Sequence, residues 1–308
     1  MLDPVLSLIG RTPLVRLRKI EENHGLNFEL YGKLEKCNPS GSIKDRAALK
    51  MIEEAEKNGL LKEGSLLVEA TSGNMGISLA LIGARKGYKV RIYMPESASK
   101  ERRLLIAAYG AEIVLTPAKD GMRGSNEAAT KAVAEEGAVW LKQFENPANS
   151  LAHYETTGPE LAAQLDGQVA ALFAGFGTGG TISGIARYFK EQGIEAKIFG
   201  IEPAESPLLS QGKAGPHRIE GIGANFVPAV LEKRLIDEVV DVKGSDAFAL
   251  TSELAAEEGL LVGVSSGAAL AGCLLRKGEV KKGGRVVVIL PDGADRYLSI
   301  EGLYGQKH

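Results

Sequence analysis

One lysine stands where its amine is expected to be uncharged. The segment from residue 38 to residue 46 reads NPSGSIKDR. Ser42 is a suitable N-cap for a helix whose apolar residues recur every fourth position from Ile43 to Ala55, so Lys44 falls in its first turn. The positive end of the helix dipole disfavours another cation there, and a neutral amine is the form that makes Schiff bases. The segment therefore indicates covalent amine chemistry, with a solvated lysine as the alternative.

A second segment, residues 69–76, reads EATSGNMG and lies between a buried apolar run and a helical pattern. Backbone amides at a helix start bind small anions. The hydroxyls of Thr71 and Ser72 and the amide of Asn74 add donors at the same place. The segment favours a carboxylate receptor, and a plain capped turn is the alternative.

A third segment, residues 175–181, reads GFGTGGT at another junction of strand and helix. Its glycines let the backbone approach a phosphate, and Thr178 and Thr181 add hydroxyl donors. The same residues satisfy G-x-G-x-x-G, and Glu202 follows about twenty residues later, which leaves a nicotinamide dinucleotide site as an alternative. The threonines and the late place of the motif in the chain favour a terminal phosphate monoester.

Weaker signals complete the set of chemical candidates. Residues 263–269 read GVSSGAA, where a serine hydroxyl can donate to a neutral ring nitrogen, although capping also explains both serines. The four histidines are scattered, and Cys37 and Cys273 form no Cys-x-x-Cys pair, so we expect no metal site. We interpret Cys37 as a small buried packing residue.

The elements that must position these segments alternate along the chain. Short β-branched runs and amphipathic stretches follow one another from about residue 65, which predicts βαβ units and parallel sheets. The turn-rich segment 145–150 is the best candidate for a domain boundary, and residues 202–228 are irregular enough to be a lid or a binding loop. We predict strands at 65–69, 90–94, 112–115, 138–142, 169–174, 197–201 and 285–290. We predict helices at 74–86, 126–136, 155–165, 182–192, 246–258 and 266–276, and a further helix that follows the strand at 90–94 and ends at 108.

Composition excludes several classes of protein. The chain has 308 residues, which suggests about two domains. Its 37 basic and 39 acidic residues leave a net charge of −2, so a nucleic-acid partner is not expected. No window of 18 consecutive apolar residues indicates a membrane span, and the first twenty residues do not read as a signal peptide. We therefore expect a cytoplasmic protein.

Taken together, these segments resemble the cysteine synthase (O-acetylserine sulfhydrylase) family of pyridoxal-phosphate enzymes. The resemblance covers nearly the whole chain. Cystathionine β-synthases share most of the same segments. The matching stretches begin with IGRTPLV at 9–15 and continue with QFENPAN at 143–149, TTGPE at 156–160, GPH at 215–217, GIGA at 221–224 and DRYLS at 295–299.

The resemblance implies roles for individual residues. Lys44 forms the Schiff base with pyridoxal 5′-phosphate and then acts as the general base. Asn74 bonds the ring hydroxyl, and Ser265, or its neighbour Ser266, meets the pyridine nitrogen. Thr71, Ser72, Asn74 and Gln143 hold the substrate, and Gly177, Thr178, Gly179, Gly180 and Thr181 cradle the cofactor phosphate.

The resemblance also implies an α/β fold of two lobes, the fold type II of the tryptophan synthase β subunit, with mostly parallel sheets and flanking helices. Residues 36–145 form a smaller mobile domain, and residues 1–35 with 146–308 form a larger one. The implied reaction replaces the acetate of O-acetyl-L-serine by sulfide, through an aminoacrylate, to give L-cysteine. A homodimer is implied, and a serine acetyltransferase is a further partner of some relatives.

Two residues depart from the family pattern. Met75 stands where threonine is usual, and Asn225 stands where a glycine commonly follows GIGA. We expect both to face the cleft between the lobes and to bear on the donor and the nucleophile. Serine, cysteine or homocysteine chemistry, giving cystathionine, lanthionine or sulfide, is the alternative within the family. A nicotinamide-dependent oxidoreductase and a non-catalytic binding protein are the alternatives outside it.

Overall fold

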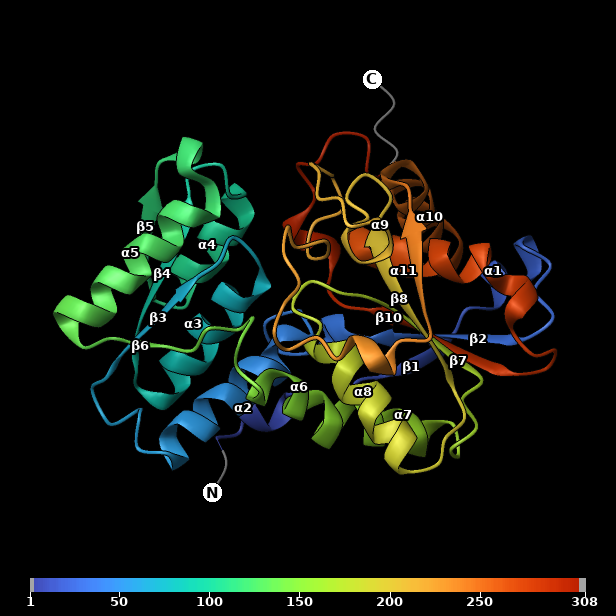
Figure 1. Cartoon of the computed structure of the whole chain (residues 1–308), viewed down its shortest axis with the longest axis horizontal. Helices are drawn as coiled ribbons and strands as arrows, with labels where there is room; N and C mark the ends of the chain where they lie inside the picture. Colours follow the sequence, from blue (N-terminus) through green and yellow to red (C-terminus); the bar gives the residue numbers. More distant parts are fainter. Residues whose placement is uncertain (1–2, 305–308) are drawn as a thin grey trace.

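The computed structural model describes residues 3–304, which form two β-sheets with helices packed on both faces of each (Figure 1). The larger sheet has the strand order β1-β2-β10-β7-β8-β9, and the smaller has the order β5-β4-β3-β6. The larger comprises β1 (Leu14–Arg16), β2 (Glu29–Leu34), β7 (Ala171–Gly175), β8 (Lys197–Pro203), β9 (Glu238–Val242) and β10 (Arg285–Leu290). The smaller comprises β3 (Leu66–Ala70), β4 (Lys89–Pro95), β5 (Glu112–Thr116) and β6 (Val139–Trp140).

Parallel pairing dominates both sheets. Every pair in the smaller sheet is parallel, and in the larger only β1 runs antiparallel, against β2. Such sheets are covered on both faces, so their strands are apolar at nearly every position. In β10 the side chains of Val286 and Val288 enter one core cluster and those of Val287 and Ile289 the opposite one. The sheet is therefore the middle layer of three.

The helices that cover these sheets have the following bounds: α1 (Arg18–Asn23), α2 (Lys44–Lys57), α3 (Asn74–Lys86), α4 (Lys100–Ala108), α5 (Gly121–Glu136), α6 (Ala148–Ala152), α7 (Gly158–Gln164), α8 (Gly180–Glu191), α9 (Leu208–Gln211), α10 (Gly244–Glu258) and α11 (Val264–Leu275). A π-helical turn, His153–Thr157, joins α6 to α7. Short 3₁₀ turns cover Leu6–Leu8, Glu35–Cys37, Ala118–Asp120, Lys233–Leu235, Lys277–Glu279 and Ala294–Arg296.

The fold prediction is confirmed: the chain is α/β, with mostly parallel sheets and flanking helices. The predicted bounds of α3 and β10 are correct, and the predicted end of α4 at Ala108 is correct. β1, β2, α1 and β9 were not predicted. The expected boundary segment 145–150 becomes helical at Ala148, and the division of the chain at residues 36 and 145 stays a prediction.

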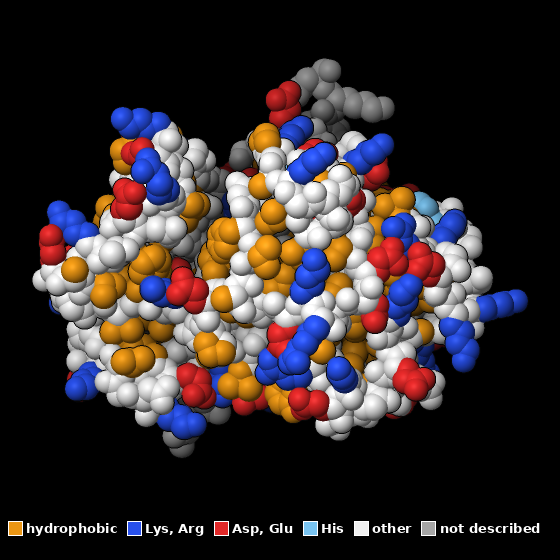
Figure 2. Space-filling view, in the orientation of Figure 1, with side chains coloured by type: hydrophobic (Ala, Val, Ile, Leu, Met, Phe, Trp, Pro, Cys, Tyr) orange, Lys and Arg blue, Asp and Glu red, His pale blue; other side chains and the backbone are white. Residues whose placement is uncertain are grey.

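Charged side chains of both signs are mixed over the face shown in Figure 2, with apolar patches between them. Within residues 3–304, no helix combines the length and the apolar character needed to cross a membrane.

Candidate functional site

Lys44 lies in the first turn of α2, as the sequence predicts, and is the first residue of the helix. Gly41 turns the preceding chain with φ +82°, a conformation that other residues rarely adopt. The N-cap is Ile43 instead of Ser42, but the Ser42 hydroxyl still accepts a hydrogen bond from the Lys44 amide at 3.3 Å. The Ile43 amide donates to the carbonyl of Pro291 at 2.8 Å. The start of α2 is thereby attached to the chain leaving β10.

Asp292, just beyond β10, joins three of the candidate segments. Its backbone bridges Ser42, and its carbonyl accepts a hydrogen bond from the Gly263 amide at 3.0 Å. Its buried carboxylate accepts from Asn74 Nδ2 at 2.6 Å and from the Tyr297 hydroxyl at 2.5 Å. Sequence reasoning missed Asp292; an acidic residue directly after a wholly apolar strand was the available signal.

Burial and charge act in opposite directions on Lys44. Burial lowers the pKa of its amine to about 8, and the negative charge of Asp292 partly offsets this effect. Within residues 3–304 the amine has no ion-pair partner. The neutral form of the amine, which the sequence predicts, is therefore far more accessible near neutral pH than in an ordinary lysine, although the protonated form still predominates below pH 8.

Asn74, the first residue of α3, is fixed at both ends of its amide. Its Nδ2 donates to Asp292, and its Oδ1 accepts from Arg296 Nη1 at 2.9 Å. The same guanidinium donates to the Ser40 carbonyl at 2.8 Å. Because one partner must accept and the other must donate, the amide orientation is determined. The second hydrogen of Nδ2 remains available to a ligand.

The predicted carboxylate receptor lies at the carboxyl ends of β3 and β6. The Thr71 hydroxyl accepts a hydrogen bond from the Gly73 amide at 3.1 Å, which holds the turn before α3. Glu69 is buried behind this turn, accepts from Trp140 Nε1 at 3.1 Å, and is contacted by the amide of Gln143. Burial raises the pKa of Glu69 to about 8. Glu69 thus links the receptor turn to the segment that carries Gln143.

The glycine loop needs its glycines for packing as well as for ligand approach. Gly179 has φ +82°, and a Cβ there would lie 2.6 Å from the Leu231 side chain. A Cβ on Gly177 would lie 2.5 Å from the carbonyl of Gly221, and one on Gly180 would lie 2.1 Å from Asn149 Oδ1. Only a backbone without side chains fits between these neighbours.

The same loop presents unused donors. Among the residues described, the amides of Gly177, Thr178 and Gly179 donate to no other group, and α8 begins at Gly180 with its dipole directed at the loop. The Thr178 hydroxyl accepts from the Gly180 amide at 3.3 Å. This is a receptor for an anion at a helix start.

Ser265 and Ser266 differ in their surroundings. A Cβ on Gly221 would lie 4.0 Å from Ser265 Oγ, and Gly221 in turn contacts Gly177 of the glycine loop. Ser266 is completely buried, and its hydroxyl has no partner within residues 3–304. Ser265 is therefore the serine that lies near Gly221, the neighbour of the glycine loop.

Arg46, two residues after Lys44 in α2, lies in an ion-pair cluster that the sequence did not reveal. Its guanidinium contacts Glu35 at 2.8 Å and Glu160 at 2.6 Å, and Lys33 contacts Glu160 at 2.7 Å. The pKa of Glu160 falls to about 2 because hydrogen bonds and charges of Arg46 and Lys33 outweigh its burial. The cluster anchors the start of α2 to β2 and α7.

Two expectations about single residues are wrong, and one alternative loses its support. Met75 is only 1% exposed within the core beside the smaller sheet, so its thioether does not face an open cleft. Cys37 is exposed instead of buried. Glu202 is buried, and its carboxylate accepts from the amides of Leu209 and Ser210, both at 2.9 Å. It is therefore not free to bind a ribose, which removes the main support for a dinucleotide site.

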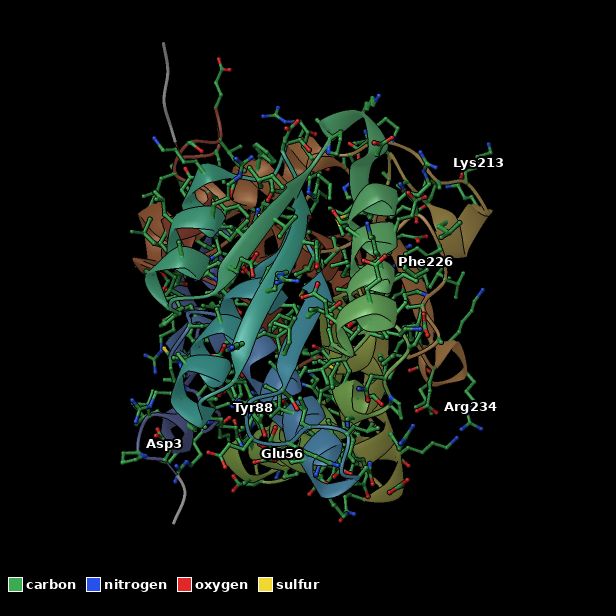
Figure 3. The ribbon with its side chains drawn as sticks, turned by 90° about the vertical axis from the view of Figure 1, so that its left-hand side faces the viewer. Asp3, Glu56, Tyr88, Lys213, Phe226 and Arg234 are labelled. Carbon is green, nitrogen blue, oxygen red and sulfur yellow. The ribbon has the colours of Figure 1, made fainter. Side chains whose placement is uncertain are left out.

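Asn225, the other departure, is exposed. Its neighbour Phe226 is 52% exposed and packs edge-on against Phe144 with ring centroids 5.0 Å apart. Figure 3 shows Phe226 at the margin of the molecule, on the side opposite Asp3. Because Phe144 follows Gln143, this aromatic pair joins the loop of Asn225 to the receptor segment.

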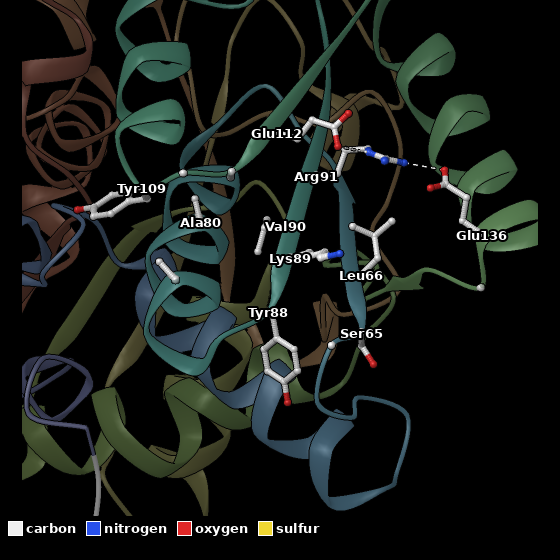
Figure 4. A pocket seen from close by; sticks show the side chains of 15 residues that line it. Ser65, Leu66, Ala80, Tyr88, Lys89, Val90, Arg91, Tyr109, Glu112 and Glu136 are labelled. Carbon is white, nitrogen blue, oxygen red and sulfur yellow. Dashed lines mark hydrogen bonds and ion pairs between the residues drawn. The ribbon is translucent and has the colours of Figure 1, made fainter.

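A groove of about 700 Å³ lies away from these segments, at the amino ends of β3, β4 and β5 (Figure 4). Its Arg91 is already paired with Glu112 and Glu136, both at 2.6 Å. Ligands of parallel sheets bind at the carboxyl ends of the strands, where all four candidate segments lie. The groove is therefore not the candidate site.

Comparison with known proteins agrees with this geometry. The family model described as "Pyridoxal-phosphate dependent enzyme" matches residues 5–292. A protein named cysteine synthase from Staphylococcus aureus (strain Mu50 / ATCC 700699) is 46% identical over 298 residues, 96% of each chain.

Two solved structures are similar over nearly the whole chain. The crystal structure of an O-ureido-L-serine synthase has a TM-score of 0.95 at 39% identity and covers 100% of this chain and 97% of its own. That of a hydrogen sulfide-producing enzyme from Fusobacterium nucleatum has a TM-score of 0.92 at 43% identity and covers 97% and 100%.

Proposed function

The chain belongs to the family of pyridoxal-phosphate dependent enzymes, and on that premise we propose that it is a cysteine synthase, which replaces the acetate of O-acetyl-L-serine by sulfide. The observation that carries the proposal is Lys44, whose amine has a pKa lowered by burial to about 8 and stands at the start of α2, under the influence of the Asp292 charge. The 46% identity to a cysteine synthase supports this reaction over others of the family.

The residues present fit the cofactor. Its phosphate is a dianion near neutral pH, and the glycine loop offers free amides, two threonine hydroxyls and the positive end of α8. Lys44 would attach to its aldehyde carbon. The free hydrogen of Asn74 Nδ2 would donate to the ring oxygen, and Ser265 would donate to the ring nitrogen.

When bound, pyridoxal phosphate supplies an electron sink for the bond that breaks at the substrate Cα. The chain supplies the groups around it. Thr71, Ser72 and Gln143 hold the substrate carboxylate, which fixes the orientation of the Cα–H bond. The substrate amine would displace Lys44 from the aldehyde carbon and so free it as a neutral amine. Lys44 then takes the proton from Cα, and the pKa of about 8 places this base near the working pH.

The leaving group decides between the donors. Acetate leaves more readily than hydroxide or a thiolate, so O-acetyl-L-serine is the favoured donor. The likeness to a hydrogen sulfide-producing enzyme and the exposed amide of Asn225 keep serine and cysteine as secondary donors, since an amide can hydrogen-bond the substituent on Cβ.

The test is kcat/KM for O-acetylserine, serine and cysteine in parallel, with sulfide and then with homocysteine as acceptor. O-acetylserine with sulfide is expected to be the best pair. If serine with homocysteine is better by more than about tenfold, about 1.4 kcal/mol in transition-state binding, the enzyme forms cystathionine instead. A visible absorption band of the purified protein, removed by a competing amine, checks the cofactor separately.

We further propose that the protein is a cytoplasmic homodimer. As in some relatives that the sequence resembles, a serine acetyltransferase is proposed as its partner. Light scattering of the purified protein determines the oligomeric state, and co-purification with a serine acetyltransferase from the same source tests the partner. A monomer or the absence of a complex would contradict these two proposals without affecting the reaction.

A further inference from the structure

The glycine loop rests on a second layer formed by α6 and the π-helical turn His153–Thr157. This layer packs so closely on α8 that a Cβ on Gly184 would lie 2.3 Å from the carbonyl of Ser150 and 2.7 Å from His153 Cβ. Insertions of a π turn in helical segments are frequent at functional sites. Two buried side chains of the layer, Asn149 and His153, reach up to the two threonine hydroxyls of the loop.

Asn149 determines the direction of the Thr178 hydroxyl. Its Nδ2 donates to the carbonyl of Gln143 at 2.8 Å and to Thr178 Oγ1 at 3.0 Å. Because a carbonyl can only accept, the amide cannot be flipped. Thr178 Oγ1 also accepts from the Gly180 amide at 3.3 Å. Both lone pairs of the hydroxyl are then used, so its hydrogen is left for an acceptor on the other side.

His153 determines the direction of the Thr181 hydroxyl in the same way. The ring is buried, with Nδ1 2.9 Å from Thr157 Oγ1 and Nε2 3.2 Å from Thr181 Oγ1. Burial and the nearby cations Arg46 and Lys44 hold its pKa well below the usual value, so the ring is neutral and has one donor and one acceptor.

The hydrogen bond between the Thr157 hydroxyl and His153 determines the tautomer of the His153 ring. The buried Thr157 hydroxyl has no other partner among residues 3–304, so it must donate its hydrogen to Nδ1 or leave it unpaired. With Nδ1 as acceptor, the proton of the ring is on Nε2, and Nε2 donates to Thr181 Oγ1. The Thr181 hydrogen is then free to point away from the histidine.

We propose that Asn149 and His153 are positioning residues that turn the hydroxyl hydrogens of Thr178 and Thr181 toward a phosphate monoester bound by the glycine loop. This inference rests on the proposed function, because the phosphate is that of the cofactor. Hydrogen bonds to a dianion are stronger than neutral ones, so pre-orienting each hydroxyl strengthens phosphate binding before the ligand arrives.

The test compares two cofactor forms on apo-protein. Pyridoxal phosphate and pyridoxal, which has no phosphate, are titrated into wild-type protein and into the Asn149→Ala and His153→Ala variants, with circular dichroism as the check on folding. Affinity for pyridoxal phosphate is expected to fall about ten- to a hundred-fold, and affinity for pyridoxal to change by less than about threefold. Equal losses for both ligands would overturn the proposal.

Double-mutant cycles separate positioning from packing. His153→Ala should have almost no further effect in a Thr181→Val background, and Asn149→Ala almost none in a Thr178→Val background, since the hydroxyl to be oriented is gone. His153→Gln places an amide NH₂ near the position of Nε2 and should restore most of the affinity, whereas His153→Asn should not. Additive losses, or rescue by Asn instead of Gln, would contradict the proposal.

The tautomer has its own readout. Nitrogen NMR of ¹⁵N-histidine-labelled protein should show His153 protonated on Nε2, with or without cofactor. Protonation on Nδ1 would overturn the assignment for His153. If wild-type protein binds no pyridoxal phosphate at all, the proposed function fails; if it binds and turns over substrate while the cycles are additive, only the present inference fails.

Discussion

Asn74 and Asp292 are 218 residues apart in the sequence, yet Nδ2 of the first donates to Oδ2 of the second at 2.6 Å. The contact joins the carboxyl end of the smaller sheet to that of the larger, since Asn74 follows β3 and Asp292 follows β10. Arg296 holds the other end of the Asn74 amide. The amide is therefore oriented by the larger sheet although it is carried by the smaller.

Replacement of Asp292 by asparagine should lower the pKa of Lys44 below about 8. The carboxylate is the charge that raises this pKa against burial, and an asparagine oxygen can still accept from Asn74. The measurement is an NMR titration of the Lys44 amine in apo-protein. An unchanged pKa would show that Asp292 carries no charge in the folded protein.

Replacement of Lys44 by alanine should abolish turnover, by about a thousandfold or more, and leave the fold intact. The covalent attachment and the base are lost together, whereas the amine has no ion-pair partner within residues 3–304 to leave unpaired. Steady-state rates and the melting temperature check both parts. Turnover near the wild-type rate would contradict the proposed mechanism.

The positions of Lys44 and the glycine loop at helix starts were predictable because glycines, hydroxyls and a helix start lie within a few consecutive residues. β1 was missed because it has only three residues, and β2 was missed because its parallel partner, β10, lies far along the chain. Asp292 and Arg46 were missed for a related reason, since their partners lie far along the chain. Met75 was misplaced because its expectation came from the family pattern alone, whereas α3 is buried continuously from Met75 to Gly83.

Gly179→Ala should weaken binding of pyridoxal phosphate and lower stability. Alanine is strained at φ +82°, and its Cβ would meet the Leu231 side chain at 2.6 Å, so the loop must move. Gly212→Ala is the matched control, because Gly212 has φ +70° with no neighbour within 4 Å of the added carbon. Thermal melting of the control Gly212→Ala should show a loss of stability of about 1 kcal/mol. Titration with pyridoxal phosphate should show that the control binds the cofactor with unchanged affinity.

The buried Glu69 should make the wild-type protein less stable as pH rises. Its pKa is about 8 when folded against 4.5 for an ordinary glutamate, so the folded state retains a proton that the unfolded state loses. The retained proton adds on the order of a few kcal/mol to the free energy of unfolding. This contribution is complete below about pH 4.5 and is lost as pH rises through 8. Glu69→Gln should remove this fall, as measured by urea unfolding at pH 5, 7 and 9. Parallel curves for both proteins would refute the assignment.

Arg46→Met should destabilise the fold by about 3–5 kcal/mol, because it leaves the buried carboxylate of Glu35 without a cation and leaves Glu160 with Lys33 alone. Arg123→Met removes a pair whose arginine side chain is 72% exposed and should change stability by less than about 1 kcal/mol. Urea unfolding of both variants makes the comparison. In the wild-type protein, the lowered pKa of Glu160, about 2, contributes to the free energy of unfolding. This contribution is present above pH 4.5 and is lost as pH falls toward 2.

The pairing of β2 with β10 also sets an order of events during synthesis. The smaller sheet is complete once residue 140 has left the ribosome, whereas β2 waits for a partner at Arg285–Leu290. The Ser42 bridge to Asp292 forms later still. A nascent chain thus carries Lys44 without the surroundings that lower its pKa until Asp292 has left the ribosome, and the lysine acquires its reactivity only then.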